Sequence, residues 1–267
     1  MPFADVNDVS LFYTDEGGGP AILFVHGWAC DSHDWSWQLP YFGAKYRVIA
    51  ADNRGHGRST VPAGGYTPQQ FAADLAALIR QREAGPVIAV GHSLGGVIVN
   101  LVAVEHPELV RGVVAIDPAY GVDAKAQRGI DATIAALATP EGAVAAANGF
   151  VRMSTDATPA FLKTWHRRRA LGAPRHVLAQ TFINIYDGPG QVGRRDATEA
   201  LLARRRIPFL TMYMGRRYEC AAWERQFCTL PADQVECLDS GHWPHQEMPE
   251  RVNALIDAWI GKLPPPD

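Results

Sequence analysis

Short apolar runs alternate along the chain with longer stretches that carry a single apolar face. Runs of four to seven residues rich in valine, isoleucine and alanine are typical of strands buried on both sides. The strands predicted in this way, together with one alternating segment at 9–14, are 21–25, 46–51, 87–90, 110–116, 207–212 and 235–238. The predicted helices between them are 35–42, 68–79, 94–106, 221–227 and 249–260. Alternation of strand and helix predicts right-handed βαβ units and a mostly parallel sheet flanked by helices.

This alternation stops between residues 118 and 204. The segment is helical in composition, and its predicted helices are 130–138, 142–150, 159–171 and 177–185. We therefore expect an α/β core built from 1–117 and 205–267, with 118–204 inserted as a helical lid over the carboxyl edge of the sheet.

Composition and charge indicate which kinds of partner and location the protein can have. The chain has 267 residues, 47% of them hydrophobic, which is enough for a large core. A net charge of −3 argues against nucleic acid or an anionic membrane as the main partner, and the arginine runs 167–169 and 204–206 are expected on solvated faces. No apolar run has the length of a membrane span, and the first residues do not resemble a secretory leader, so we expect a cytoplasmic protein.

The four cysteines, at positions 30, 220, 228 and 237, lack the spacing of a metal site. We expect reduced thiols, although Cys220 and Cys228 are close enough in sequence to pair. His245 follows His242 by three positions, but no further ligand cluster accompanies them, so no metal and no cofactor are predicted.

The most informative stretch is 87–96, an apolar strand that runs into Gly91-His92-Ser93-Leu94-Gly95. A buried strand, a sharp turn and a helix are the context of a nucleophile elbow, in which the serine has a strained backbone. Ser93 Oγ would then stand at the head of a helix, where the N–H of Leu94 can stabilise a developing oxyanion.

Two further loops follow predicted parallel strands and so reach the same edge of the sheet. The first is 26–28 (His-Gly-Trp), and the second, 240–244, contains His242 and Trp243. A serine hydroxyl attacks only when an imidazole takes its proton, and a carboxylate must hold that imidazole in the right tautomer. The sequence offers Ser93 and His242 for the first two roles.

The carboxylate has two candidates. Asp117 directly follows the strand 110–116, on a rigid strand end next to the elbow strand. Glu219 lies in the turn after 207–212, beside Arg216 and Arg217, which we expect to hold it in a salt bridge. We favour Asp117 and keep Glu219 as the alternative acid.

These motifs, with the loop 52–59 (Asp-Asn-Arg-Gly-His-Gly-Arg-Ser), resemble the α/β-hydrolase fold family, specifically its lid-bearing small-molecule hydrolases. The resemblance covers residues 9–260 and is weakest in the lid. It implies that Ser93 is the nucleophile, that His242 is the general base, and that the N–H groups of Trp28 and Leu94 form the oxyanion hole. Relatives place the acid either after the strand 207–212 or at the end of the strand after the elbow. Trp28, His92 and Trp243 flank the serine and histidine and are the predicted substrate contacts.

The leading functional hypothesis is a serine hydrolase for a small apolar or aromatic ester, lactone or related acyl compound. Some relatives use the same three sites for cofactor-independent dioxygenation of hydroxyquinolones, and others hydrolyse C–C bonds, so both stay open. A binding protein that retains the pocket is a third alternative. The substrate is expected to be a small molecule, and neither its identity nor the oligomeric state follows from the sequence.

Overall fold

The computed structural model describes residues 2–265, which form one eight-stranded sheet with helices on both faces. The predicted α/β core domain also includes residues 1, 266 and 267, and these three lie outside the described residues. The sheet order is β1-β2-β4-β3-β5-β6-β7-β8; β2 is antiparallel to both of its neighbours, and all other pairs are parallel. The strands are β1 (Phe3–Val6), β2 (Val9–Glu16), β3 (Ala21–Val25), β4 (Arg47–Ala51), β5 (Val87–His92), β6 (Val110–Ile116), β7 (Phe209–Met214) and β8 (Gln234–Leu238). The predicted α/β-hydrolase fold is confirmed; β1 was not predicted.

The structure has a helix at each predicted position, with changes at the boundaries, and two helices that were not predicted, at 195–202 and 244–247. The predicted helix 35–42 is a 3₁₀ turn, η1 (Ser32–Trp35), followed by α1 (Leu39–Gly43), and the predicted helix 221–227 starts three residues earlier. The helices of the sheet layers are α1, α2 (Pro68–Gln81), α3 (Leu94–Glu105), α8 (Arg195–Leu202), α9 (Tyr218–Glu224), α10 (Pro244–Glu247) and α11 (Pro249–Ile260). Short 3₁₀ turns complete them: η2 (Pro107–Leu109), η3 (Gly215–Arg217) and η4 (Arg225–Phe227).

Alternation along each strand divides the core into two layers. Leu23 and Val25 of β3 face the layer of α2 and α3, whereas Ile22 and Phe24 face the layer of α1 and α11. Because both faces of the central strands are covered, their sequences are continuously apolar, as the pattern of short runs predicts.

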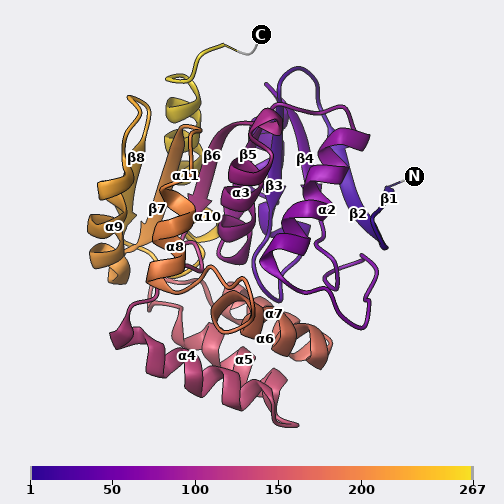
Figure 1. Cartoon of the computed structure of the whole chain (residues 1–267), viewed down its shortest axis with the longest axis vertical. Helices are drawn as coiled ribbons and strands as arrows, with labels where there is room; N and C mark the ends of the chain where they lie inside the picture. Colours follow the sequence, from indigo (N-terminus) through magenta and orange to yellow (C-terminus); the bar gives the residue numbers. More distant parts are fainter. Residues whose placement is uncertain (1, 266–267) are drawn as a thin grey trace.

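Four helices between β6 and β7 gather at one end of the sheet (Figure 1). They are α4 (Ala124–Leu137), α5 (Gly142–Arg152), α6 (Ala160–Gly172) and α7 (Arg175–Tyr186). Trp28, just past the carboxyl end of β3, donates its indole N–H to the carbonyl of Leu178 on α7, so this is the carboxyl edge. Within residues 2–265, no helix is both long and apolar enough to cross a membrane.

Candidate active site

Ser93 occupies a sharp turn between β5 and α3. Its backbone angles, φ 53° and ψ −114°, lie in a region that non-glycine residues rarely adopt. A Cβ on Gly91 would overlap the carbonyl of Gly95, and a Cβ on Gly95 would overlap the carbonyl of Val25. Both glycines are therefore required for α3 to pack closely behind β3 and β5, as expected for a nucleophile elbow. The Ser93 hydroxyl makes no capping bond to α3, which leaves it free to react.

Two backbone N–H groups lie near this serine. Leu94 is the first residue of α3, so its N–H has no acceptor within the helix. The Gly27–Trp28 segment packs directly against the elbow, since a Cβ on Gly27 would lie 3.1 Å from Ser93 Cβ. In the described part of the chain, the backbone N–H of Trp28 has no hydrogen-bond partner. These are the two groups that the resemblance implies for an oxyanion hole.

His242 and Asp117 are joined by a short hydrogen bond. Asp117 directly follows β6, has a positive φ of 40° and is buried, and its Oδ2 lies 2.5 Å from His242 Nδ1. In the neutral imidazole this bond makes Nδ1 the donor, so the free lone pair is on Nε2. The backbone of His242 is also held, because its carbonyl accepts from His92 Nε2 at 2.7 Å and its N–H donates to Met153 at 3.1 Å.

The second oxygen of Asp117 has its own donors. Oδ1 accepts from Arg217 at 3.1 Å and from the backbone N–H of Met214 at 3.3 Å. Burial opposes ionisation of this carboxyl, but the Arg217 guanidinium and the bond from His242 hold the pKa of Asp117 below its ordinary value. Asp117 is thus a buried carboxylate.

Within residues 2–265, the alternative acid, Glu219, makes neither a hydrogen bond nor an ion pair with His242. Its side chain is exposed and accepts a 3.4 Å hydrogen bond from the hydroxyl of Tyr218. The expectation that the neighbouring arginines would hold Glu219 is wrong for Arg217, which turns to Asp117 instead. The reason is that a buried carboxylate needs a cationic partner more than an exposed one does.

Ser93, Asp117 and His242 line one cavity of about 620 Å³ between the carboxyl edge of the sheet and the helices α4, α5 and α7. Much of its wall is apolar and includes Phe150 and Phe182. Among residues 2–265, Ser93 and His242 share the cavity without a direct hydrogen bond between their side chains. Such bonds are often long in enzymes without substrate.

The three predicted substrate contacts also lie at this cavity. The Trp28 ring packs against Phe150 and Phe182. Trp243 is stacked on His166 of α6, with ring centroids 3.9 Å apart. The Nε2 of His92 binds the His242 carbonyl, so this residue also supports the histidine loop. Their contact with a substrate stays a prediction.

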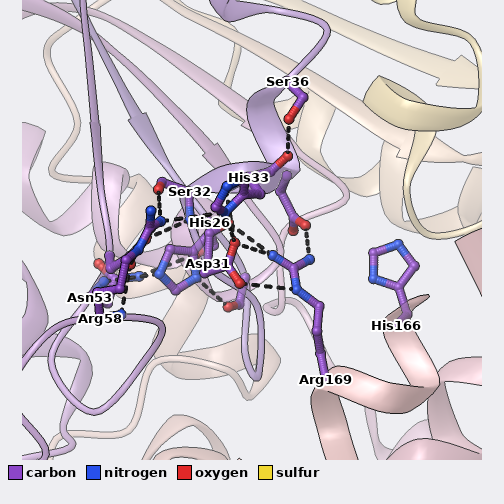
Figure 2. Close-up of polar contacts among 12 residues, drawn as sticks. His26, Asp31, Ser32, His33, Ser36, Asn53, Arg58, His166 and Arg169 are labelled. Atoms are coloured by element: carbon purple, nitrogen blue, oxygen red, sulfur yellow. Dashed lines mark hydrogen bonds and ion pairs between the residues drawn. The ribbon is translucent and has the colours of Figure 1, made fainter. Parts of the chain in front are cut away.

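A buried ion pair under the cavity was not anticipated from the sequence. Arg169 of α6 reaches the loop after β3, where its guanidinium pairs with both Asp31 and Asp34. Figure 2 shows Arg169 pointing toward Asp31, with His166 one turn earlier on the same helix. On the far side of this loop, Asp52 accepts from the Ser32 N–H at 2.8 Å and pairs with Arg58.

The solvated-face prediction for the arginine runs is therefore wrong at two positions. The Arg169 side chain is 10% exposed, and that of Arg205 is 2% exposed because it pairs with the buried Glu224. The other members of both runs are exposed, as predicted. No sequence signal marks these two arginines, because their acidic partners lie elsewhere in the chain.

Asp34 is also the centre of two groups of side chains that resemble metal ligands. The groups are Cys30, Asp34 and His166, and Asp34, His92 and His245, with ligand atoms within 4.8 Å in each. Arg169 already neutralises Asp34, and its positive charge opposes the binding of a cation there. Burial lowers the pKa of His166 to about 4 and that of His245 to about 3, so these imidazoles are neutral at pH 7. All four cysteines, including Cys220 and Cys228, are free thiols.

Comparisons with known proteins agree with this geometry. A thermophilic esterase from Thermogutta terrifontis superposes with a TM-score of 0.80 at 25% identity, over 95% of this chain and 94% of that one. The chain is 36% identical over 130 residues to 2-(acetamidomethylene)succinate hydrolase from Mesorhizobium japonicum, and 45% identical over 98 residues to a non-heme haloperoxidase from Rhodococcus erythropolis. These matches cover 49% and 36% of this chain, and 47% and 36% of the relatives' own lengths, so the chain spans less than half of either relative.

The match to a family model is more extensive. The model of the alpha/beta hydrolase family covers residues 22–255, from β3 to α11 and through the serine, aspartate and histidine loops. The chain therefore belongs to the alpha/beta hydrolase family.

Proposed function

We propose that the protein is a serine hydrolase that cleaves a small apolar or aromatic ester, lactone or related acyl compound. The observation that carries the proposal is the 2.5 Å pairing of His242 with Asp117 in the cavity that also contains the strained Ser93. In this proposal Asp117, not Glu219, is the acid of the triad. A buried carboxylate on a strand end is held more rigidly than an exposed one on a turn.

The proposed reaction has two steps. Ser93 Oγ bonds to the acyl carbon while its proton passes to His242 Nε2, and the carbonyl oxygen gains the electron pair. The N–H groups of Trp28 and Leu94 stabilise this oxyanion, each by about 3 kcal/mol. The bond to the leaving oxygen breaks as His242 returns the proton to it. A water molecule then attacks the acyl carbon of the acyl-enzyme while His242 takes its proton. The bond to Ser93 Oγ breaks, which releases the carboxylic acid product and restores Ser93.

The substrate class follows from the cavity wall. Trp28, Phe150, Phe182, Ile185 and Trp243 present an apolar surface to an acyl group beside the nucleophile. The helices α4, α5 and α7 complete this wall, and we include in the proposal that the helices α4 to α7 of the inserted segment 118–204 act as a lid that sets specificity. The relatives named as an esterase and as 2-(acetamidomethylene)succinate hydrolase support hydrolytic chemistry on this fold.

The test is a substrate panel combined with labelling of the serine. We expect a fluorophosphonate probe to modify Ser93, p-nitrophenyl acetate and butyrate to be hydrolysed, and Ser93→Ala to abolish both reactions. Oxygen uptake on a hydroxyquinolone that survives Ser93→Ala, without labelling, would instead indicate the cofactor-independent dioxygenase. Turnover of dienoic ring-fission products alone would indicate a C–C hydrolase. Absence of turnover on every substrate would favour a binding protein.

A further inference from the structure

Arg217 lies in the turn η3, directly after β7, and its guanidinium is hydrogen-bonded to the segment that follows β6. Its guanidinium donates to Asp117 Oδ1 at 3.1 Å, to the Pro118 carbonyl at 2.7 Å and to the Tyr120 carbonyl at 2.8 Å. The guanidinium also lies 4.8 Å from the centre of the Tyr213 ring. Three acceptors and an aromatic face leave this group a single orientation.

We propose that Arg217 is a positioning residue for the Asp117–His242 pair. Arg217 fixes the rotation of the Asp117 carboxylate and sets the pH range in which the pair is active. This inference rests on the proposed hydrolase function for its kinetic test. It assigns a role to a side chain that lines the cavity and, within residues 2–265, has no hydrogen bond to Ser93.

The division of the carboxylate oxygens supports the positioning role. Oδ2 binds His242, while Oδ1 binds Arg217 and the N–H of Met214. Rotation of the carboxylate about its Cβ–Cγ bond would break all three bonds at once. With Arg217 removed, the weak 3.3 Å bond from Met214 alone would hold Oδ1.

The charge of Arg217 supports the second part of the proposal. A proton that enters the Asp117–His242 pair adds positive charge close to the guanidinium, which is unfavourable. Whichever of the two groups takes the proton, the loss of Arg217 makes protonation easier. The pair would then lose its proton-accepting form at a higher pH than in the unmodified protein.

The other groups around the pair do not replace this charge. Burial lowers the pKa values of the neighbouring imidazoles and raises those of the neighbouring phenol and thiol, so all are neutral at pH 7: His92, His166, His245, Tyr186 and Cys237. The charged side chains elsewhere on the cavity wall are solvent-accessible and therefore screened: Asp123, Lys125, Arg216 and Glu219. Among residues 2–265, Arg217 is thus the cation that contacts the pair.

The experiment compares three variants of the full chain: Arg217→Met, Arg217→Lys and the matched control Arg216→Met. Arg216 precedes Arg217 in the same turn, is exposed, and has no hydrogen bond to Asp117 within the described residues. The rate constant kcat/KM for p-nitrophenyl butyrate is measured from pH 5 to 9. We expect Arg217→Met to move the midpoint of the acid limb up by about 0.5 to 1 pH unit and to lower kcat more than it changes KM.

Arg217→Lys keeps the charge, so its midpoint is expected within about 0.3 pH units of the unmodified protein. Arg216→Met is expected to leave the midpoint unchanged. NMR titration of the His242 imidazole gives the same shift without any substrate, and circular dichroism establishes that each variant is folded. If Arg217→Met does not fold, the comparison is made with Arg217→Gln.

The outcomes separate this inference from the proposed function. An unchanged midpoint in a folded Arg217→Met protein, by kinetics or by NMR, would overturn the role of Arg217 even if Ser93 is the nucleophile. An upward NMR shift in a protein that hydrolyses no ester would support the role of Arg217 while the hydrolase proposal failed. A shift of equal size in Arg216→Met would show that any charge on this turn has the same effect, which also overturns the inference.

Discussion

Replacing Arg169 with methionine removes the cation that neutralises the buried Asp34. The Arg169 guanidinium pairs with Asp34, whose side chain is 0% exposed, and with Asp31, and these contacts tie α6 to the loop after β3. Methionine keeps an apolar stem of similar length, but it removes the guanidinium that lies 4.8 Å from the centre of the Trp165 ring and leaves the Asp34 carboxylate without a charged partner. We therefore expect Arg169→Met to destabilise the protein strongly.

The magnitude follows from the burial of the pair. Removing one partner of a buried ion pair costs about 3 to 5 kcal/mol of the free energy of unfolding, since the remaining charge is desolvated without compensation. For a chain of this size each kcal/mol lowers Tm by about 2 to 4 °C, so a drop of about 10 °C is expected. The double variant Asp34→Asn, Arg169→Met removes both charges and should recover at least about 2 kcal/mol of that loss.

The effect should also depend on pH, with a sign fixed by the pKa of Asp34. In the unmodified protein, burial alone would raise this pKa, but the Arg169 guanidinium outweighs it and holds the pKa well below its ordinary value. The contribution of Asp34 to stability is therefore present above about pH 4 and is lost only below that. Arg169→Met removes the largest of the effects that oppose burial, so the pKa of Asp34 rises and this group gains a proton at a higher pH than in the unmodified protein. The difference between the two proteins should shrink from pH 8 to pH 5.

Urea unfolding of the four proteins across this pH range, with the single variant Asp34→Asn completing the cycle, measures the coupling free energy directly. Arg168→Met is the matched control, because Arg168 is the preceding, exposed residue of the same helix, and its change should stay within about 0.5 kcal/mol. If Arg169→Met unfolds at the same urea concentration as Arg168→Met, the buried pair makes no net contribution and the reasoning is refuted.

Three further predictions concern the acid, the elbow and the buried histidines. Asp117→Asn should lower kcat/KM for p-nitrophenyl butyrate by about 10³- to 10⁴-fold, whereas Glu219→Gln should change it less than about 2-fold; the reverse order would make Glu219 the acid. Gly95→Ala should lower the free energy of unfolding by more than about 3 kcal/mol, because its Cβ would overlap a carbonyl oxygen of β3. Gly129→Ala in the exposed helix α4, where a Cβ meets nothing within 4 Å, should raise it by about 1 kcal/mol; equal effects in urea unfolding would contradict this. Finally, the free energy of unfolding should fall as the pH is lowered from about 6.5 to about 4. Each histidine that takes up a proton only on unfolding should contribute up to about 1.4 kcal/mol per pH unit to this fall. These are histidines whose pKa burial lowers to about 3 or about 4: His56, His166 and His245. A free energy of unfolding that does not change over this pH range would contradict the prediction.

The fold is predictable from the sequence because its central strands are covered on both faces. Each of them therefore appears as a continuous apolar run, and the runs at 21–25 and 110–116 match β3 and β6 residue for residue. The edge strand β1 escaped prediction because it is only four residues long and two of its residues are exposed. The elbow could also be predicted from the sequence, because the two glycines of Gly-x-Ser-x-Gly are the positions at which a Cβ would overlap the backbone.

Side-chain partners across the fold were harder to anticipate. The sequence favours Asp117 over Glu219 on grounds of rigidity, but it assigns Arg217 to Glu219 because the two are neighbours in the chain. Arg217 instead pairs with an acid 100 residues away, and Arg169 pairs with one 135 residues away. Such partners depend on which loops the sheet brings to one edge and on which carboxylate is buried, and neither is encoded in local spacing.

The position of Asp117, the proposed acid, directly after β6 has a structural consequence for the whole site. β6 is the direct neighbour of β5, and the Ser93 N–H donates to the Ile116 carbonyl at 2.9 Å, so the serine and Asp117 are tied together through the backbone. On its other side β6 pairs with β7, whose following turn carries Arg217 rather than an acid. Because the carboxylate comes from the middle strand of the three, the turn after β7 is free to supply a cation to it. An acid located on that turn would take the place of the arginine and would lie one strand further from the serine. The arrangement is therefore compatible with an arginine in the turn after β7, which is the other position that the family resemblance implies for the acid.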